Sequence, residues 1–369
     1  MISPGSSVDA LPPMRTAERL DRLRARLAED GVGALLVTTA TNVRYLTGFT
    51  GSAGSLWVDG VRAVLVTDGR YQDQAPDQVA AAGVDAEVVV TGVDRPSPLP
   101  TLSAGVDRVS LEAGSISWGE QRRLAEVLDA EVVPSEGLVE ALREVKDEGE
   151  VARIAAAAAL ADDALAAVGP TITAGVTEAE VAIALDHAMR GGGASDRAFE
   201  TIVAGGPNSA LPHARPGRRP LVHGDLVVCD FGAVVDGYRS DMTRSMRVGG
   251  TGTGAEADML AAVLEAQAAG LAAVADGVLA AEVDAACRAV LTDAGLADAF
   301  THGTGHGVGL DIHEGPGLSS SATGSLGSGQ VVTVEPGVYV VGLGGVRWED
   351  TVLVTDDGHR LLTGSPKAL

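Results

Sequence analysis

Cysteine is scarce in this chain, and long apolar runs are absent. The two cysteines among its 369 residues, Cys229 and Cys287, are too few for a disulfide framework and lack the spacing of a thiolate zinc site. No apolar run is long enough to cross a bilayer. The amino-terminal stretch also lacks the basic patch and apolar core of a secretory signal. We therefore expect a cytoplasmic protein with no membrane contact.

Aromatic and basic residues are also few. Aromatics make up 3% of the chain, so alanine, valine and leucine must fill the cores that a hydrophobic content of 46% allows. The lysines and arginines number 27 against 50 aspartates and glutamates, which gives a formal net charge of −23. This charge argues against binding to nucleic acid, whose phosphates are also negative. A generally acidic, solvated surface explains most of the excess, although some carboxylates could be metal ligands.

The length predicts two domains, and the first half alternates between helical and strand patterns. Residues 1–12 are rich in proline and glycine and are expected to be disordered, and residues 13–133 are expected to form a small α/β domain. Residues 41–51 are interpreted as a loop with an extended segment. Strands are expected at 34–37, 56–58, 61–66, 86–90, 106–111 and 131–133, and helices at 14–30, 69–82 and 118–128.

The second half has a different pattern, with long helices followed by strands. Residues 134–148 are expected to link the halves, and residues 149–369 to form an α+β domain. Thr177 and Glu180 have the spacing of a capping box, which predicts the start of a helix. Helices are expected from the link to about residue 168 and at 177–189, 256–275 and 281–294, with a closing pair of strands at 331–341 and 346–354.

The stretch from residue 225 to residue 244 predicts a hairpin that brings two carboxylates together. With Asp236-Gly237 at the turn, Gly232 lies opposite Asp241, and Asp230 shares the face of Gly232. Asp230 and Asp241 are then diagonal neighbours, ~7–8 Å apart at the backbone. Two solvated aspartates near a turn are the alternative. The apolar run before Asp230 favours a buried carboxylate instead, and such a group needs a partner.

Three further candidates lie downstream, each in an apolar or glycine-rich segment. His306 is the central histidine of HGTGHGVGLDIHE, Glu335 ends an apolar strand, and Glu349 lies in another strand. Together with Asp230 and Asp241 they make four carboxylates and one imidazole, whose charge would balance two divalent cations. Such a donor set suits hard or borderline ions, manganese or cobalt before a metal that prefers thiolates.

The segments around these residues resemble the metallopeptidases with the pita-bread fold, and most of all their proline-specific branch, aminopeptidase P and prolidase. The matching segments are, in order, GGPNSALPHARP, DFGAVVDGYRSDMTR, HGTGHGVGLDIHE, VEPGVYV and GVRWEDTVLV. The resemblance implies a creatinase-like α/β amino-terminal domain and an α+β pita-bread catalytic domain. It also implies two similar halves in the catalytic domain, which the sequence itself does not show.

The resemblance assigns roles to the five candidate ligands. It implies that Asp230 holds one ion with both oxygens, that Asp241 and Glu349 bridge two ions, and that His306 and Glu335 complete the second site. Manganese is the ion implied first, with cobalt, zinc or iron as alternatives. Such ions would activate water near neutral pH and polarise a peptide carbonyl.

Five more residues are candidates for catalysis. The resemblance implies that His213 donates a hydrogen bond to the tetrahedral intermediate, that His313 contacts substrate near the scissile bond, and that His302 assists proton transfer or contacts substrate. Arg347 shares a strand face with a ligand two residues away, so it could keep the carboxylates ionised. Tyr339 could donate to a ligand carboxylate, and a core tyrosine is its alternative.

The resemblance implies hydrolysis of the bond between an amino-terminal residue and a following proline. An Xaa-Pro aminopeptidase is the interpretation favoured here. An Xaa-Pro dipeptidase and a related pita-bread amide hydrolase are the enzymatic alternatives, and a silent module that binds peptides or proteins is the non-enzymatic one. The complete ligand set favours an enzyme. A homodimer is expected from the resemblance alone.

Overall fold

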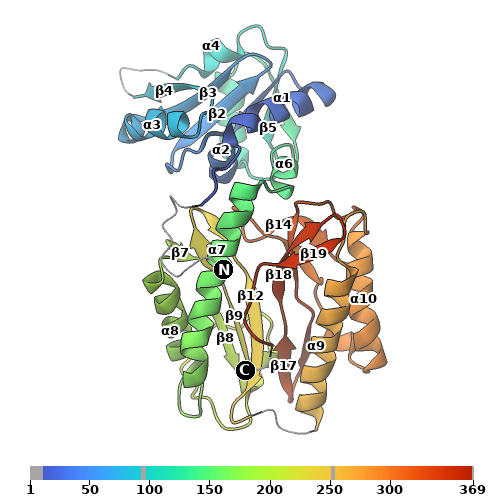
Figure 1. Ribbon diagram of the computed structural model, residues 1–369. Helices are drawn as coiled ribbons and strands as arrows, with labels where there is room; N and C mark the ends of the chain where they lie inside the picture. Colours follow the sequence, from blue (N-terminus) through green and yellow to red (C-terminus); the bar gives the residue numbers. More distant parts are fainter. Residues whose placement is uncertain (1–10, 93–96, 251–253, 368–369) are drawn as a thin grey trace. The chain divides into compact units, whose positions relative to one another are not determined.

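The computed structural model describes residues 11–92, 97–250 and 254–367, and these fold as two compact units (Figure 1). One unit comprises residues 14–143, and the other comprises residues 144 onward with the segment before residue 14. The disorder expected at residues 1–12 falls mostly outside the described residues. Leu11 packs against a core of the second unit, and the Pro12 carbonyl accepts a hydrogen bond from Arg153 at 2.9 Å.

The first unit is built on one six-stranded mixed sheet. Its strand order is β4-β3-β2-β1-β5-β6, with antiparallel pairing from β3 to β1 and parallel pairing on either side. The strands are β1 (Ala34–Val37), β2 (Gly54–Asp59), β3 (Ala63–Asp68), β4 (Glu87–Thr91), β5 (Arg108–Glu112) and β6 (Glu131–Ser135). The helices are α1 (Arg19–Glu29), α2 (Ala40–Thr47), α3 (Gln74–Ala81), α4 (Leu99–Ser103), α5 (Trp118–Val127) and α6 (Glu140–Glu144). Of these, the last helix and β6 extend into the segment expected to be a linker.

Helix α2 corrects the expected loop at residues 41–51. Its polar and β-branched sequence gives a weak helical pattern, but Val43, Tyr45 and Leu46 are all buried. The helix ends at Gly48, whose φ of 75° is the left-handed conformation that glycine favours. The guanidinium of Arg19 lies 4.1 Å from the centre of the Tyr45 ring. Burial against the rest of the unit therefore decides the conformation, and local propensity does not.

The second unit contains two helix pairs and the strands between them (Figure 1). One pair, α7 (Glu148–Val168) and α8 (Glu178–Gly191), covers the sheet β12-β9-β8 through a shared apolar core. The other pair, α9 (Ala255–Ala273) and α10 (Ala280–Asp293), packs on the sheet β14-β13-β15-β18-β19 and the strand pair β16-β17. The strands are β7 (Asp196–Arg197), β8 (Ile202–Gly205), β9 (Leu226–Phe231), β10 (Ala233–Val235), β11 (Tyr238–Arg239), β12 (Met242–Arg247), β13 (Gly305–Gly307), β14 (Glu314–Leu318), β15 (Val331–Val334), β16 (Gly337–Val340), β17 (Gly344–Arg347), β18 (Asp350–Thr355) and β19 (Gly358–Leu361).

The closing pair of strands is interrupted, which the sequence pattern did not predict. Both strands break at the same level, between β15 and β16 and between β17 and β18. At the break the Glu335 N–H donates to the Thr304 carbonyl at 2.7 Å, and the Glu349 N–H donates to the Thr243 carbonyl at 3.2 Å. These two N–H groups therefore donate to neighbouring segments instead of to the opposite strand of their own hairpin.

The first hairpin breaks in a similar way at Gly232. A Cβ atom there would lie 1.9 Å from the Ser240 carbonyl oxygen, so only glycine fits.

Among the described helices, none combines the length and apolarity needed to cross a membrane.

Candidate metal centre

The first hairpin has the register that the sequence predicts. Val235 pairs with Tyr238 on one side of the break, and Asp230 pairs with Thr243 on the other. The same register places Asp241 opposite the glycine at the break, so Asp230 and Asp241 are diagonal neighbours. Both carboxylates are buried, with 9% and 5% of the residue exposed.

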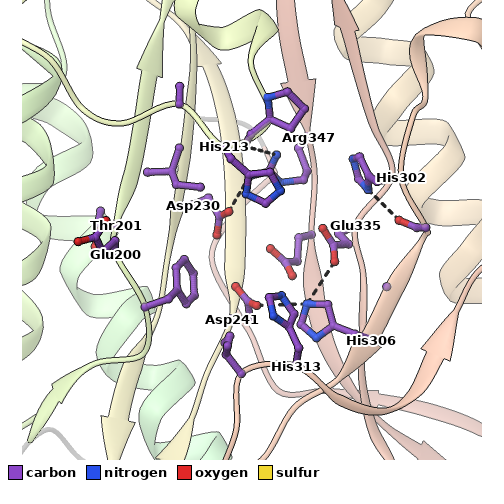
Figure 2. Close-up of a pocket in the computed structure, with 18 of the residues that line it drawn as sticks. Glu200, Thr201, His213, Asp230, Asp241, His302, His306, His313, Glu335 and Arg347 are labelled. Carbon is purple, nitrogen blue, oxygen red and sulfur yellow. Dashed lines mark hydrogen bonds and ion pairs between the residues drawn. The ribbon is translucent and has the colours of Figure 1, made fainter. Parts of the chain in front are cut away.

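The second hairpin places two glutamates face to face. Val334 pairs with Asp350 before the break, and Gly337 pairs with Arg347 after it. The unchanged register puts Glu335 directly opposite Glu349. Each hairpin thus offers two carboxylates at the level where its ladder is broken, and Figure 2 shows labelled members of both pairs facing one space.

His306, on β13, supplies the imidazole. Its Nδ1 lies 3.0 Å from the Gly307 carbonyl oxygen, so this nitrogen carries the proton and donates it. Its Nε2 lies 3.3 Å from Oε1 of Glu335 and 3.6 Å from Oδ2 of Asp241. Donor atoms of Asp241, His306 and Glu349 all lie within 4.8 Å of one another.

Three of the four carboxylates, those of Asp241, Glu335 and Glu349, favour their protonated forms when no cation is present. Burial raises the pKa of Glu335 to about 8, and the charge of Asp230 adds to the increase. Burial and the charge of Glu349 raise the pKa of Asp241 well above its usual value. The pKa of Glu349 rises for the same reasons, burial and the charge of Glu335. Clustered carboxylates without solvent are expensive to ionise.

The donor atoms present fit divalent cations. Oδ1 of Asp230 and Oδ1 of Asp241 are buried and have no hydrogen-bond partner among the described residues. Burial lowers the pKa of His306, so its neutral ring presents the Nε2 lone pair to the carboxyl oxygens of Asp241 and Glu335. A cation among these atoms would satisfy all of them at once, which hydrogen bonds alone cannot do.

Two threonines that the sequence analysis did not identify orient the ligands. Thr243 donates to Oε2 of Glu349 at 2.7 Å, and Thr333 approaches Oε1 of Glu335 at 3.3 Å. Thr333 also accepts the N–H of His306 at 3.1 Å. Each threonine stands two residues from a ligand on the same strand, at Asp241 and Glu335. The period-two spacing of a strand could therefore have identified them.

A line of hydrogen bonds connects Asp230 to His302. Arg347 donates to Asp230 at 2.6 Å and to the Tyr339 hydroxyl at 2.6 Å. The Tyr339 hydroxyl lies 3.0 Å from Nε2 of His302, and the other ring nitrogen of His302 lies 2.8 Å from the Gly303 carbonyl. Burial lowers the pKa of His302 to about 4. The neutral ring of His302 therefore donates to the Gly303 carbonyl and accepts from the Tyr339 hydroxyl. Tyr339 thus contacts the side chains of Arg347 and His302, and not the ligand carboxylate that the sequence analysis considered.

The remaining candidate histidines line a cavity of about 510 Å³ that opens onto the carboxylates. The ring centre of His313 lies 4.3 Å from that of His306, at 78°. His213 is exposed, and Figure 2 shows its ring beside Asp230, above the rings of His306 and His313. A wall that the sequence analysis did not identify is formed by Phe199, Glu200, Thr201 and Ile202. No motif or spacing marks that wall.

Two family models match the chain. The model of metallopeptidase family M24 matches residues 152–356, and the model of the creatinase/prolidase N-terminal domain matches residues 19–145. The chain belongs to metallopeptidase family M24.

Its relatives include an Xaa-Pro dipeptidase from Pyrococcus furiosus, 33% identical over 354 residues that make up 95% of this chain and 99% of the relative. The solved structure of an Xaa-Pro dipeptidase from Bacillus anthracis is similar with a TM-score of 0.91 and 37% identity, covering 96% of this chain and 99% of that one. An X-Pro aminopeptidase structure from Thermotoga maritima is similar with a TM-score of 0.84 and 33% identity, covering 95% of this chain and 99% of that one.

Membership of family M24 confirms three predictions made from the sequence. The chain is a metallopeptidase, its first domain is of the creatinase type, and its catalytic domain has the pita-bread fold. The family also implies binding of divalent metal ions, in agreement with the donor set. The identity of the ion and the roles of single residues stay predictions.

Proposed function

We propose that this M24 metallopeptidase hydrolyses the bond before a proline in second position, with Xaa-Pro dipeptides as its substrates. The observation that carries the hydrolytic chemistry is the set of four carboxylates and one neutral imidazole that line the cavity. The preference for proline rests on the relatives, which are named Xaa-Pro dipeptidases and X-Pro aminopeptidases.

The size of the substrate is the finer part of the proposal. The sequence analysis favoured an aminopeptidase, and the T. maritima structure supports that second candidate. The dipeptidase is preferred here because the relative from P. furiosus and the structure from B. anthracis both carry that name and align over 95% or more of this chain. A cavity of about 510 Å³ is large enough for a dipeptide beside the ions.

Five residues would hold two ions: Asp230, Asp241, His306, Glu335 and Glu349. When bound, the ions would polarise the scissile carbonyl and lower the pKa of a water molecule. The carboxylates must lose their protons to serve as ligands, and Thr243 and Thr333 keep two of them oriented by hydrogen bonds. Manganese is proposed as the ion because the donor set is rich in oxygen.

Residues outside the ligand set would handle the substrate. We place His213 and His313 as hydrogen-bond donors to the carbonyl oxygen, where negative charge develops during attack. Arg347 would orient Asp230 through the contact at 2.6 Å. Tyr339 and the neutral His302 extend this line, and His302 would contact the substrate where it lines the cavity. A cytoplasmic homodimer completes the proposal, the dimer from the family resemblance alone.

The test is hydrolysis of three peptides by the manganese-loaded protein: Ala-Pro, Ala-Pro-Ala and Ala-Ala. The proposal expects Ala-Pro to be cleaved with a much larger kcat/KM than the other two. Faster cleavage of Ala-Pro-Ala would replace the dipeptidase by the aminopeptidase. Equal cleavage of Ala-Ala would contradict the requirement for proline.

A further inference from the structure

The position of His213 depends on the loop that carries it. Residues 206–217 run from the end of β8 along the cavity, and Pro212, His213 and Ala214 all line it. His213 itself is exposed and forms no hydrogen bond with any residue that the structure describes. Its position must therefore come from the backbone of the loop.

Both ends of this loop are bound by one buried carboxylate. Glu178, the first residue of α8, is 0% exposed. Its Oε1 accepts the Gly205 N–H at 2.8 Å, just before the loop, and its Oε2 accepts the Gly217 N–H at 2.9 Å, at the end of the loop. The amide of Asn208 donates to both oxygens, at 2.9 and 3.2 Å.

The Glu178 carboxylate has no contact with the cavity or with the metal ligands. Its charge is satisfied by these N–H donors and by its place at the start of a helix, where the peptide dipoles favour a negative charge. Close packing around it leaves little freedom, since a Cβ atom on Gly217 would lie 3.2 Å from Oε2. A buried carboxylate that accepts these hydrogen bonds restricts the movement of both loop ends.

The middle of the loop contacts β17. Ser209 accepts the N–H of Gly345 at 2.8 Å, and the Pro212 carbonyl approaches Arg347 at 3.5 Å. Both partners belong to β17, the strand that precedes the ligand Glu349. The fixed loop ends and these contacts together set the position of His213.

We propose that Glu178 is a positioning residue for catalysis, which acts through His213 by fixing both ends of the loop at residues 206–217. The inference rests on the proposed function for its kinetic consequence. Its structural part, that Glu178 immobilises the loop, stands independently. A displacement of about 1 Å in a positioned group can lower a rate on the order of 100-fold, so the effect is measurable.

The test is Glu178→Gln, with Glu180→Gln as the matched control. The side-chain oxygen of glutamine can still accept the Gly205 N–H. Its NH2 group would then face the Gly217 N–H, and two donors cannot form a hydrogen bond with each other. Glu180 lies one half-turn further along α8, is exposed, and accepts only from Thr177 at 2.8 Å. The control therefore keeps the helix cap, because glutamine can also accept from Thr177, and it changes no contact with the loop.

Three measurements separate the outcomes. In Glu178→Gln we expect faster amide hydrogen exchange across residues 205–217, kcat/KM for Ala-Pro lowered about 10-fold or more, and an unchanged metal content. In the Glu180→Gln control we expect native exchange in this segment and native kinetics. In a His213→Ala background, Glu178→Gln should lower the rate further by less than about twofold, because two residues that act as one unit are not additive.

Unchanged exchange in the loop, full additivity with His213→Ala, or loss of metal would each overturn the inference. If Glu178→Gln does not fold, Asn208→Ala removes one donor from the same carboxylate and should give the same changes at smaller size. A wild-type protein that fails to cleave Ala-Pro would contradict the proposed function. Hydrogen exchange, which needs no substrate, would then still decide whether Glu178 holds the loop.

Discussion

Arg347 and Asp230 join the two hairpins of the catalytic domain through a hydrogen bond of 2.6 Å between Nη2 and Oδ2. Arg347 ends β17 and Asp230 lies near the end of β9, so the contact connects strands that are far apart in the sequence. The arginine uses one oxygen of the aspartate and leaves the buried Oδ1 without a partner among the described residues. That oxygen is therefore available to a cation.

Arg347→Lys should lower kcat/KM for Ala-Pro about 10- to 100-fold, with the fold retained. Arginine donates to Asp230, Thr243 and Tyr339 from three different nitrogens, and a single ammonium group cannot reach all three. Steady-state kinetics with metal analysis provides the measurement. Arg360→Lys, on exposed β19, is the control and should be native. A native rate for Arg347→Lys would show that the charge alone matters.

Asp241→Asn should weaken binding of both ions and lower activity by several orders of magnitude. The substitution removes a negative charge and one oxygen donor at the level where the two hairpins meet. Calorimetric titration of manganese into the metal-free variant measures the first effect, and Ala-Pro hydrolysis measures the second. The metal-free variant should melt at or above the temperature of the metal-free wild type, because repulsion among buried carboxylates is reduced.

Asp298→Asn, on an exposed turn, is the control for this substitution. It should bind two ions with native affinity. If Asp241→Asn did the same and kept native turnover, the bridging role of Asp241 would have to be abandoned.

The metal-free protein should become less stable as pH rises from about 4.5 to about 8. Burial raises the pKa of Glu335 to about 8 from its usual value of 4.5, so within this window the folded state keeps a proton that the unfolded state releases. The pKa values of Asp241 and Glu349 shift in the same direction. Each such group lowers the free energy of unfolding by up to about 1.4 kcal/mol per pH unit.

Urea unfolding of chelator-treated protein at several pH values measures this slope. Glu335→Gln should flatten it, because the amide does not titrate. A slope that is identical in the variant and the wild type would show that this carboxylate does not control the pH dependence.

The sequence was sufficient to predict the first hairpin because two local signals agreed. The Asp236-Gly237 turn set the register, and the alternation of strand faces then placed Asp230 diagonally across from Asp241. The second hairpin lacked such a turn, so the opposition of Glu335 and Glu349 became visible only in the structure. Their places in predicted strands marked both glutamates as candidates, and the family resemblance implied their roles as ligands, but neither showed their geometry.

Other features depend on partners that are distant in the sequence. The strand breaks at Glu335 and Glu349 arise because carbonyls of Thr304 and Thr243 accept their amides. No pattern within residues 331–354 shows this. The contact of Glu178 with Gly217 likewise spans 39 positions. Helix α2 was mistaken for a loop because burial, which the sequence does not display, outweighs its weak helical propensity.

We propose above that two divalent ions, held by the five ligands, support hydrolysis of Xaa-Pro dipeptides. The most direct test adds manganese stepwise to chelator-treated protein and records bound metal per chain and Ala-Pro hydrolysis on the same samples. The account predicts no hydrolysis without metal and a rate that reaches its plateau as the second ion per chain binds. Full hydrolysis by protein with no residual metal would contradict it.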